Sequence, residues 1–162
     1  MKLPVPACIA LLLAGAAHAQ RPNVVLVVTD DQGDAAGCYG WRDARTPALD
    51  ALAAEGVRFA NGFCTTASCS PSRAALLSGL HGHANGTYGL QHQRHHFESF
   101  DDLRTLPALL AEAGWRTARV GKLHVAPDEV FPFETVVAAP ARNPVAMAEA
   151  CRPFVAAESD EP

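Results

Sequence analysis

Cysteine is scarce in this sequence and irregularly spaced. The 162 residues include 5 cysteines, and those that follow the apolar N-terminal stretch are Cys38, Cys64, Cys69 and Cys151. A dense disulfide framework is therefore excluded, and the spacing from Cys64 to Cys69 matches no familiar zinc pattern. The sequence does not determine whether a disulfide forms among Cys38, Cys64 and Cys151.

The chain has no large excess of either positive or negative charge. The chain carries 17 acidic and 13 basic residues, for a formal net charge of -4. Because a nucleic-acid-binding protein needs a basic face, this balance argues against nucleic acid as a partner. Any anionic ligand must instead be attracted by a local basic pocket. The length suits one domain core, and there is neither an internal repeat nor a low-complexity tract.

Long apolar runs are missing after the N-terminus, where none approaches the roughly 20 residues of a membrane-spanning helix. The first run, residues 5–17, ends in Ala17-His18-Ala19, which is typical of a secretory signal peptide cleaved before Gln20. We interpret residues 1–19 as a signal peptide. The mature chain is expected to have no membrane attachment and to be exported to a periplasmic, secreted or lysosome-like compartment.

Hydrophobic patterning predicts strands that alternate with helices. Residues 23–29 form a continuous β-branched run, typical of a strand buried on both faces of a parallel sheet. Further strands are expected at 57–59 and 115–120. Helices are expected at 46–56, 70–79, 106–113 and 144–157. This order predicts an α/β domain with a mainly parallel sheet flanked by helices.

Cys69 lies just before one of the predicted helices, and Arg73 lies one turn inside it. Ser70 is expected to be the N-cap and Pro71 the first helical residue. The free N–H groups of the first turn would then face whatever Cys69 carries, and such a helix end binds phosphate or sulfate esters. The alternative is a buried thiol beside a capped helix.

Two acidic residues, Asp30 and Asp31, directly follow the predicted strand at 23–29. Open α/β sheets place their sites at this edge. Two carboxylates about 4 Å apart repel by roughly 4 kcal/mol at an effective dielectric near 20, so an ionised pair needs a cation or water. Hard oxygen ligands favour calcium or magnesium over zinc. A helix cap or a solvated turn is the alternative.

Lys122 and His124 follow the predicted strand at 115–120. In an extended chain, side chains two residues apart share a face, so a cation and an imidazole would meet an anion together. The preceding glycines do not form a P-loop. Six residues separate Gly114 from Gly121, and Leu123 stands where a P-loop needs Ser or Thr.

The segment 81–96 is polar and rich in histidine and glycine, which predicts a long functional loop. Its histidines lack the spacing of closed zinc sites, so a polar loop at a pocket rim is the favoured interpretation. Those histidines are His81, His83, His92, His95 and His96. Asn85-Gly86-Thr87 is formally a glycosylation sequon, relevant only in a eukaryotic secretory cell.

These motifs together resemble the type I sulfatase family. Its hallmark is Cys-x-Pro-Ser-Arg followed by x-x-Leu-x-Ser/Thr-Gly, and residues 69–79 fill every fixed position. Residues 114–124 are similar to its second signature, and Asp30-Asp31 to its paired acids. Within the family, segments 85–90, 95–101, 121–125 and 130–133 resemble the heparan N-sulfatases, or sulfamidases. The similarity runs from about Arg21 to the last residues.

The resemblance implies an alkaline-phosphatase-like fold and hydrolysis of sulfuric esters or sulfamates, with N-sulfoglucosamine at a glycan end as substrate. It implies that a formylglycine-generating or sulfatase-maturating enzyme oxidises Cys69 to formylglycine, whose hydrate attacks sulfur. By the same resemblance, Arg73 would hold the hydrate, Lys122 would bridge it to the sulfate, and His124 would take up a proton.

For the metal, the resemblance implies that Asp30, Asp31 and the modified Cys69 bind calcium, with magnesium as the alternative. Members of the family are much longer, and their other ligands lie in later sequence. Residues 20–162 are therefore expected to be the N-terminal portion of a catalytic domain, incomplete at the C-terminus, with weak metal binding and poor turnover. Two alternatives stay open: a phosphonate or phosphodiester hydrolase of the same superfamily, and a truncated non-catalytic fragment.

Overall fold

The structure is a computed structural model that describes residues 21–140 and 142–157. The predicted signal peptide at 1–19 lies outside the described residues. Four helices of seven or more residues are present in the described ranges: α2 (Pro47–Glu55), α3 (Cys69–Ser78), α5 (Leu106–Glu112) and α6 (Pro144–Val155). Each one confirms a helix predicted from the sequence.

Proline and capping residues explain where these helices begin. Helices α2, α5 and α6 each have proline in the first turn, where the missing N–H costs nothing. At α6 the Asn143 side chain also accepts a hydrogen bond from the Ala146 N–H at 3.0 Å. Helix α3 ends at Gly79, whose φ of 70° is in the left-handed region that glycine adopts without strain.

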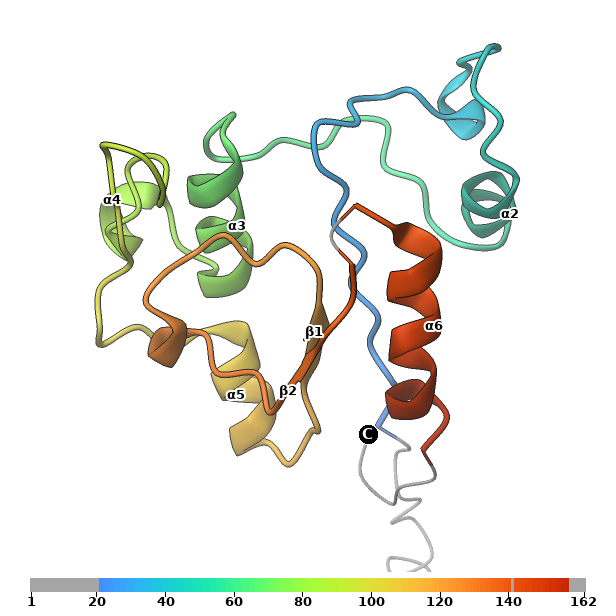
Figure 1. The fold of residues 1–162 in the computed structure, drawn as a ribbon. Coiled ribbons are helices and arrows are strands. Elements are labelled where there is room, and N and C mark those ends of the chain that lie inside the picture. The colour runs from blue at the N-terminus through green and yellow to red at the C-terminus, as the bar shows by residue number, and fades with distance from the viewer. Residues whose placement is uncertain (1–20, 141, 158–162) are drawn as a thin grey trace, which may run out of the picture.

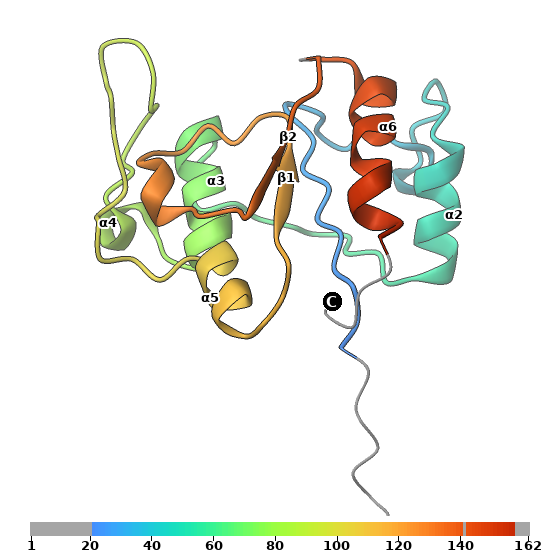
Figure 2. The same ribbon diagram turned by 60° about the horizontal axis from the view of Figure 1, so that its bottom comes forward.

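The sheet has two parallel strands, β1 (Ala118–Val120) and β2 (Thr135–Val137). Ala118 is opposite Thr135, and Val120 is opposite Val137. Figures 1 and 2 show this pair between α3 and α5 on one side and α6 on the other. The α/β class, with a parallel sheet flanked by helices, is thereby confirmed.

Residues 23–29 do not form the predicted strand. They are extended but have no ladder partner, and Val25 and Val27 are each 77% exposed. In both views the segment runs between the sheet and α6. A buried strand needs hydrogen-bonded neighbours and covered faces, and the described residues supply neither.

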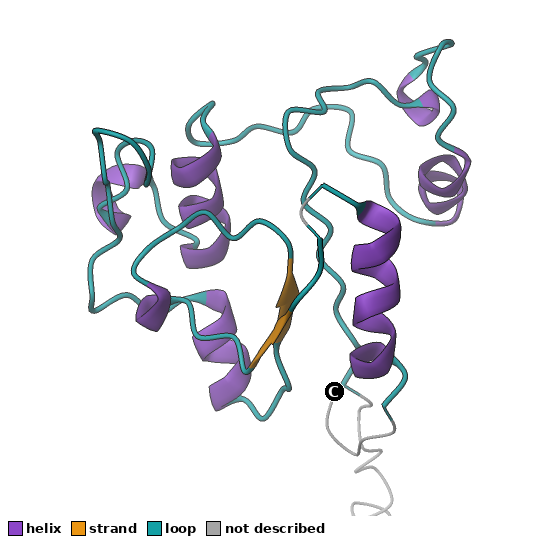
Figure 3. Cartoon of the chain, in the orientation of Figure 1, coloured by secondary structure: helices purple, strands orange, loops and turns teal. Residues whose placement is uncertain are grey.

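The strand predicted at 57–59 is also absent. Val57 is 82% exposed and Phe59 is 73% exposed, and both lie in a long connection between α2 and α3. Figure 3 shows how much of the described chain is loop of this kind. Strand β2, by contrast, was not predicted, although its β-branched Thr135-Val136-Val137 triplet suits a strand.

The short helices lie in connecting segments. They are η1 (Gly37–Tyr39), α4 (Gly82–Asn85) and η2 (Asp128–Val130). Helix α4 interrupts the loop predicted at 81–96, which is otherwise irregular. No helix within the described ranges has both the length and the apolar character needed to cross a bilayer.

The apolar core joins α3 to the segment that follows β1. Ala74 and Leu77 on α3 pack with Val125, Val130 and Phe131, all of them buried. This packing holds α3 against the segment that follows β1, where Leu123 also packs on the cluster. The core therefore brings together the two parts of the chain that carry the sulfatase-like motifs.

Asn85 of the formal sequon is fully buried. Its side chain donates to the Leu80 carbonyl at 3.1 Å and accepts from the Thr87 N–H at 2.9 Å. A buried side-chain amide with these bonds is closed to a glycosylating enzyme in the folded chain. The sequon is explained as a structural turn.

Candidate active site

Three charged residues from distant parts of the chain meet beside α3. Asp30 ends the extended N-terminal segment, Arg73 lies on α3, and Lys122 follows β1. The Lys122 Nζ donates to Asp30 Oδ2 at 2.7 Å, and the Arg73 Nη2 reaches Asp30 Oδ1 at 3.4 Å. Two cations thus share one carboxylate.

Arg73 also fixes the backbone of the segment that carries Lys122. Its Nη1 donates to the Lys122 carbonyl oxygen at 2.8 Å, and its side chain is only 12% exposed. A guanidinium can satisfy both contacts because its donors form a rigid fork. Arg73 therefore positions Lys122 as well as contributing its own charge.

The two cations act on the protonation of Asp30. The hydrogen bond from Lys122, followed by its charge and by Arg73, holds the pKa of the Asp30 carboxyl below its usual range. Partial burial opposes this shift but is the smaller effect overall. Asp30 is therefore ionised in the folded protein, with compensating positive charge at hand.

A cavity of about 450 Å³ opens at the first turn of α3. Asp30, Asp31, Cys69 and Arg73 all line it, so the residues predicted as metal ligands and nucleophile precursor face one space. Lys122 and His124 are not among its lining residues. Lys122 is linked to the cavity through its ion pair with Asp30.

Helix α3 begins earlier than predicted. Cys69 is its first residue and Ser68 is the N-cap, without a side-chain capping bond. Ser70 is therefore not the N-cap. It is fully buried in the first turn, and its Oγ accepts from the Gln91 N–H at 3.0 Å. Pro71 is likewise the third helical residue, so Cys69 itself lies at the free N–H groups of the helix end.

His124 does not share a face with Lys122, contrary to the expectation for an extended chain. Strand β1 ends at Val120, and Gly121 and His124 have φ values of 78° and 63°. The positive φ of His124 shows that the chain is not extended through residues 122–124, so the alternation that would place both side chains on one face does not apply. Lys122 reaches Asp30, whereas His124 turns to the ring of His92.

His124 is held in its neutral form. Its pKa is lowered first by burial and then by the positive charge of Lys122, with His92 and Arg73 acting in the same direction. Its Nδ1 atom is buried and has no hydrogen-bond partner among the described residues. The ring is thus a neutral imidazole with one nitrogen unused.

His92 is the site residue that sequence reasoning missed. The sequence placed it among five histidines of a rim loop, and nothing in their spacing sets it apart. Its contact with His124 joins residues 32 positions apart, so only the folded chain reveals it.

The donor set tests whether this region alone can hold calcium. Asp30 and Asp31 offer hard carboxylate oxygens, but calcium takes about six to eight oxygen ligands. In the described part of the chain, no three residues among His, Cys, Asp and Glu are grouped to hold a metal. Asp30 is also ion-paired with two cations. The described residues therefore do not complete a calcium site.

The four cysteines within the described residues are unpaired. Cys38, Cys64, Cys69 and Cys151 are free in the structure, so none of them forms a disulfide with another. Cys64 is exposed and also lines the cavity, whereas Cys69 is half-buried. Cys69 is therefore free to be modified.

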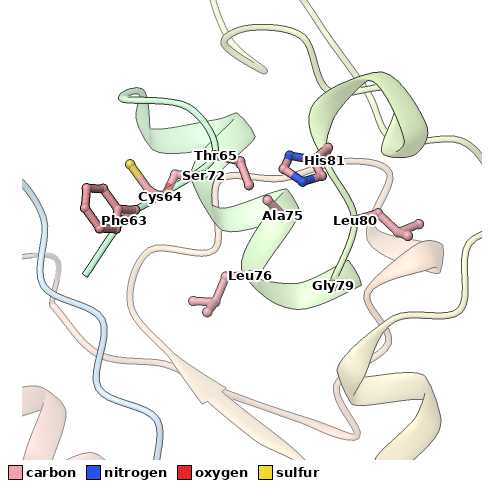
Figure 4. Close-up of a pocket in the computed structure, with 9 residues that line it drawn as sticks. All are labelled: Phe63, Cys64, Thr65, Ser72, Ala75, Leu76, Gly79, Leu80 and His81. Carbon is pink, nitrogen blue, oxygen red and sulfur yellow. The ribbon is translucent and has the colours of Figure 1, made fainter. Parts of the chain in front are cut away.

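A smaller cavity of about 270 Å³ lies along the side of α3. Figure 4 shows Phe63 and Cys64 at one end of it and Leu80 and His81 at the other, with Ala75 and Leu76 of α3 between them. No lysine, arginine or carboxylate lines it. The charge needed to bind an anion is found only at the larger of these two cavities.

Comparison with known proteins gives the family. The family model described as Sulfatase matches residues 22–158. The chain is 51% identical over 135 residues to human N-sulphoglucosamine sulphohydrolase. The match covers 83% of this chain and 27% of that protein. It is 39% identical over 123 residues to N-acetylglucosamine-6-O-sulfatase of Bacteroides thetaiotaomicron, covering 72% of this chain and 21% of that protein.

A third relative is the N-acetylgalactosamine-6-sulfatase of Rattus norvegicus, 40% identical over 132 residues. The match covers 76% of this chain and 25% of that protein. The chain thus spans about a quarter of the length of these curated relatives. With the family model matched over residues 22–158, the chain belongs to the sulfatase family.

Proposed function

We propose that the protein is a formylglycine-dependent sulfatase that hydrolyses the sulfate ester or sulfamate of a sugar. The observation that carries the proposal is the position of Cys69. Cys69 is the first residue of α3 and lines the cavity with Asp30 and Arg73. Lys122 is ion-paired with the carboxylate of Asp30. A tetrahedral anion at this helix end would meet free N–H groups and two cations.

Formylglycine made from Cys69 by a formylglycine-generating or sulfatase-maturating enzyme would supply a hydrated aldehyde as the nucleophile toward sulfur. The chain's own residues prepare the site for it. Arg73, anchored on the Lys122 carbonyl oxygen, holds positive charge one turn inside α3. Lys122, now ion-paired with Asp30, is proposed to move its ammonium to a sulfate oxygen when substrate binds.

His124 is the proton acceptor in this proposal. Burial and the neighbouring cations keep it neutral, which is the state a general base needs. Its Nδ1 has no hydrogen-bond partner among the described residues, so no other described group competes for a proton there. Both properties support the role that the family resemblance assigns to it.

Asp30 and Asp31 are proposed to supply two carboxylate ligands to a calcium ion, with magnesium as the alternative, beside the modified Cys69. All three residues line the cavity. A divalent cation there would neutralise the anionic groups gathered around sulfur. The remaining ligands are proposed to come from outside the described residues.

The substrate class is proposed from the relatives. The strongest identity among those compared, 51%, is to a protein named N-sulphoglucosamine sulphohydrolase. N-sulfoglucosamine is therefore the first substrate to test, followed by 6-sulfated amino sugars. The mature chain is proposed to act after export, with residues 1–19 as its leader. An N-terminus at Gln20 in the secreted protein would support that cleavage site.

The test is hydrolysis by the protein encoded by the full reading frame that contains this chain, expressed with a maturating enzyme. We expect release of sulfate from N-sulfoglucosamine and loss of at least about a thousandfold in kcat for Cys69→Ala, because no nucleophile remains. Cys64→Ala, which removes the other thiol of the cavity, is the matched control and should retain activity. A preference for an aryl phosphodiester or phosphonate over every sulfated substrate would contradict the proposal.

A further inference from the structure

His92 and His124 meet edge to edge. The Nδ1 of His92 lies 2.5 Å from the Nε2 of His124, and the ring planes differ by 18° with centroids 4.6 Å apart. Carbon and nitrogen atoms of face-stacked rings stay about 3.5 Å apart, so a nitrogen pair this close excludes face stacking. The two ring planes are nearly parallel, and the rings share one hydrogen bond through their edges.

One ring must donate in this bond and the other must accept, because a neutral imidazole has one of each. If the proton of His124 were on Nδ1, that N–H would be buried without a partner, at a cost of about 1–3 kcal/mol. With the proton on Nε2, His92 accepts it, and the unpartnered Nδ1 holds a lone pair. The positive charges of Lys122 and Arg73 act on this ring and favour the lone pair over a further N–H.

We propose, on the basis of the proposed sulfatase function, that His92 is a positioning residue: it accepts a hydrogen bond from Nε2 of His124 and so leaves Nδ1 of His124 as the nitrogen that takes up a proton. The bond selects one tautomer and fixes the ring plane. Such a partner to a functional histidine sets which nitrogen does the chemistry.

The position of His92 is itself fixed from the nucleophile helix. The preceding residue, Gln91, donates its N–H to Ser70 Oγ at 3.0 Å, and Ser70 is fully buried next to Cys69. His92 is half-buried, unlike the exposed His95 and His96. One short chain of contacts therefore links Cys69, Ser70, the 91–92 segment and His124.

Ser70 occupies the position that the family hallmark leaves variable. The tie between α3 and the His92 loop is therefore a feature of this chain rather than of the motif. Moving that loop would remove the partner of His124 without changing any residue of the motif.

The test is the tautomer of His124, read from two-bond nitrogen–proton correlations of this chain with labelled histidines. In the wild type we expect the proton on Nε2 alone. In His92→Phe the His124 nitrogens should average between tautomers, whereas His92→Gln should keep the proton on Nε2 because the amide oxygen accepts it. His95→Phe is the control, a histidine of the same loop without contact to His124, and should leave the His124 signals unchanged.

A wild-type proton on Nδ1, or His124 signals unchanged in His92→Phe, would overturn the proposal. Should His92→Phe fail to fold by circular dichroism, His92→Ala provides the same comparison. In the full-reading-frame enzyme we expect His92→Phe to lower kcat about 10- to 100-fold with KM within about twofold, partly rescued by His92→Gln. Absence of hydrolysis by the wild type would count against the sulfatase function, while the tautomer would still decide the role of His92.

Discussion

At the scale of single residues, the site depends on how Arg73 divides its donors. One nitrogen binds the Lys122 carbonyl and another reaches Asp30, which a point-like ammonium cannot reproduce. We expect Arg73→Lys to lower kcat/KM of the full enzyme by about 10- to 100-fold, the value of one or two charged hydrogen bonds. Steady-state kinetics measure this.

The matched control for that substitution is Arg104→Lys. Arg104 is exposed and pairs with Glu112 on the surface, where such pairs contribute little. Activity of Arg104→Lys should equal that of the wild type. Equal activity of Arg73→Lys and wild type would refute the positioning role of Arg73.

Also at the residue scale, the lowered pKa of His124 makes the stability of the folded chain depend on pH. Burial and Lys122 lower this pKa below the unfolded value of about 6.5, so the unfolded chain binds more protons than the folded chain just below that pH. Stability should therefore decrease as pH falls from about 6.5 toward the folded pKa, and His124→Gln should flatten that decrease. Urea unfolding at a series of pH values checks it, and an unchanged slope in the variant would contradict it.

At the scale of secondary structure elements, the C-terminal end of α3 is fixed by a left-handed glycine. At its C-terminal end Gly79 has φ 70°, and no atom lies within 4 Å of where a Cβ would be. Gly79→Ala should therefore destabilise the chain by about 1–2 kcal/mol through backbone conformation alone. Chemical denaturation measures this free energy of unfolding.

Gly62→Ala is the control for Gly79→Ala, because Gly62 also has open space around it but lacks a positive φ. The Gly62 substitution should be neutral or slightly stabilising, since alanine restricts the unfolded chain. Equal effects of the two substitutions would show that the left-handed cap is not what ends α3.

Local sequence signals predicted the elements that depend on local chemistry. Pro47 and Pro144 predicted the starts of α2 and α6, and Gly79 the end of α3, whereas Ser70-Pro71 placed the start of α3 two residues too late. The motif around Cys69 predicted a helix beside a charged site. The strand at 23–29 failed because strand formation depends on neighbours, which the described residues do not provide. The family resemblance predicted Arg73 and Lys122 at one site. The direct bond from Arg73 to the Lys122 carbonyl and the contact of His92 with His124 were not predicted, because each joins segments far apart in sequence.

At the scale of the whole molecule, the donor count limits metal binding. Two carboxylates at one cavity fall short of the ligands calcium needs, and Asp30 is already paired with cations. We expect this chain alone to bind calcium no more tightly than about the millimolar range typical of weak sites. Isothermal titration calorimetry checks this.

The same titration on the product of the full reading frame should show a tighter site that weakens in Asp31→Asn. Asp101→Asn, an exposed acid away from the cavity, is the control. Micromolar calcium binding by the present chain alone would contradict the proposal that further ligands come from outside the described residues.

The comparison with the relatives shows how much of a sulfatase sequence this chain represents. The chain matches them over 21% to 27% of their length and contains the cysteine helix, the acidic pair and the Lys122–His124 segment. The cation pair, the helix end and Cys69 meet within that portion. The proposed nucleophile region therefore lies within the quarter of the relatives' length that this chain matches.

The most direct measurement is the mass of the peptide that carries Cys69, taken from protein made with a maturating enzyme. The proposed function predicts the mass of an aldehyde at position 69 and an unmodified thiol at position 64. A free thiol at position 69 in all of the purified protein, under conditions in which a known sulfatase is converted, would contradict it.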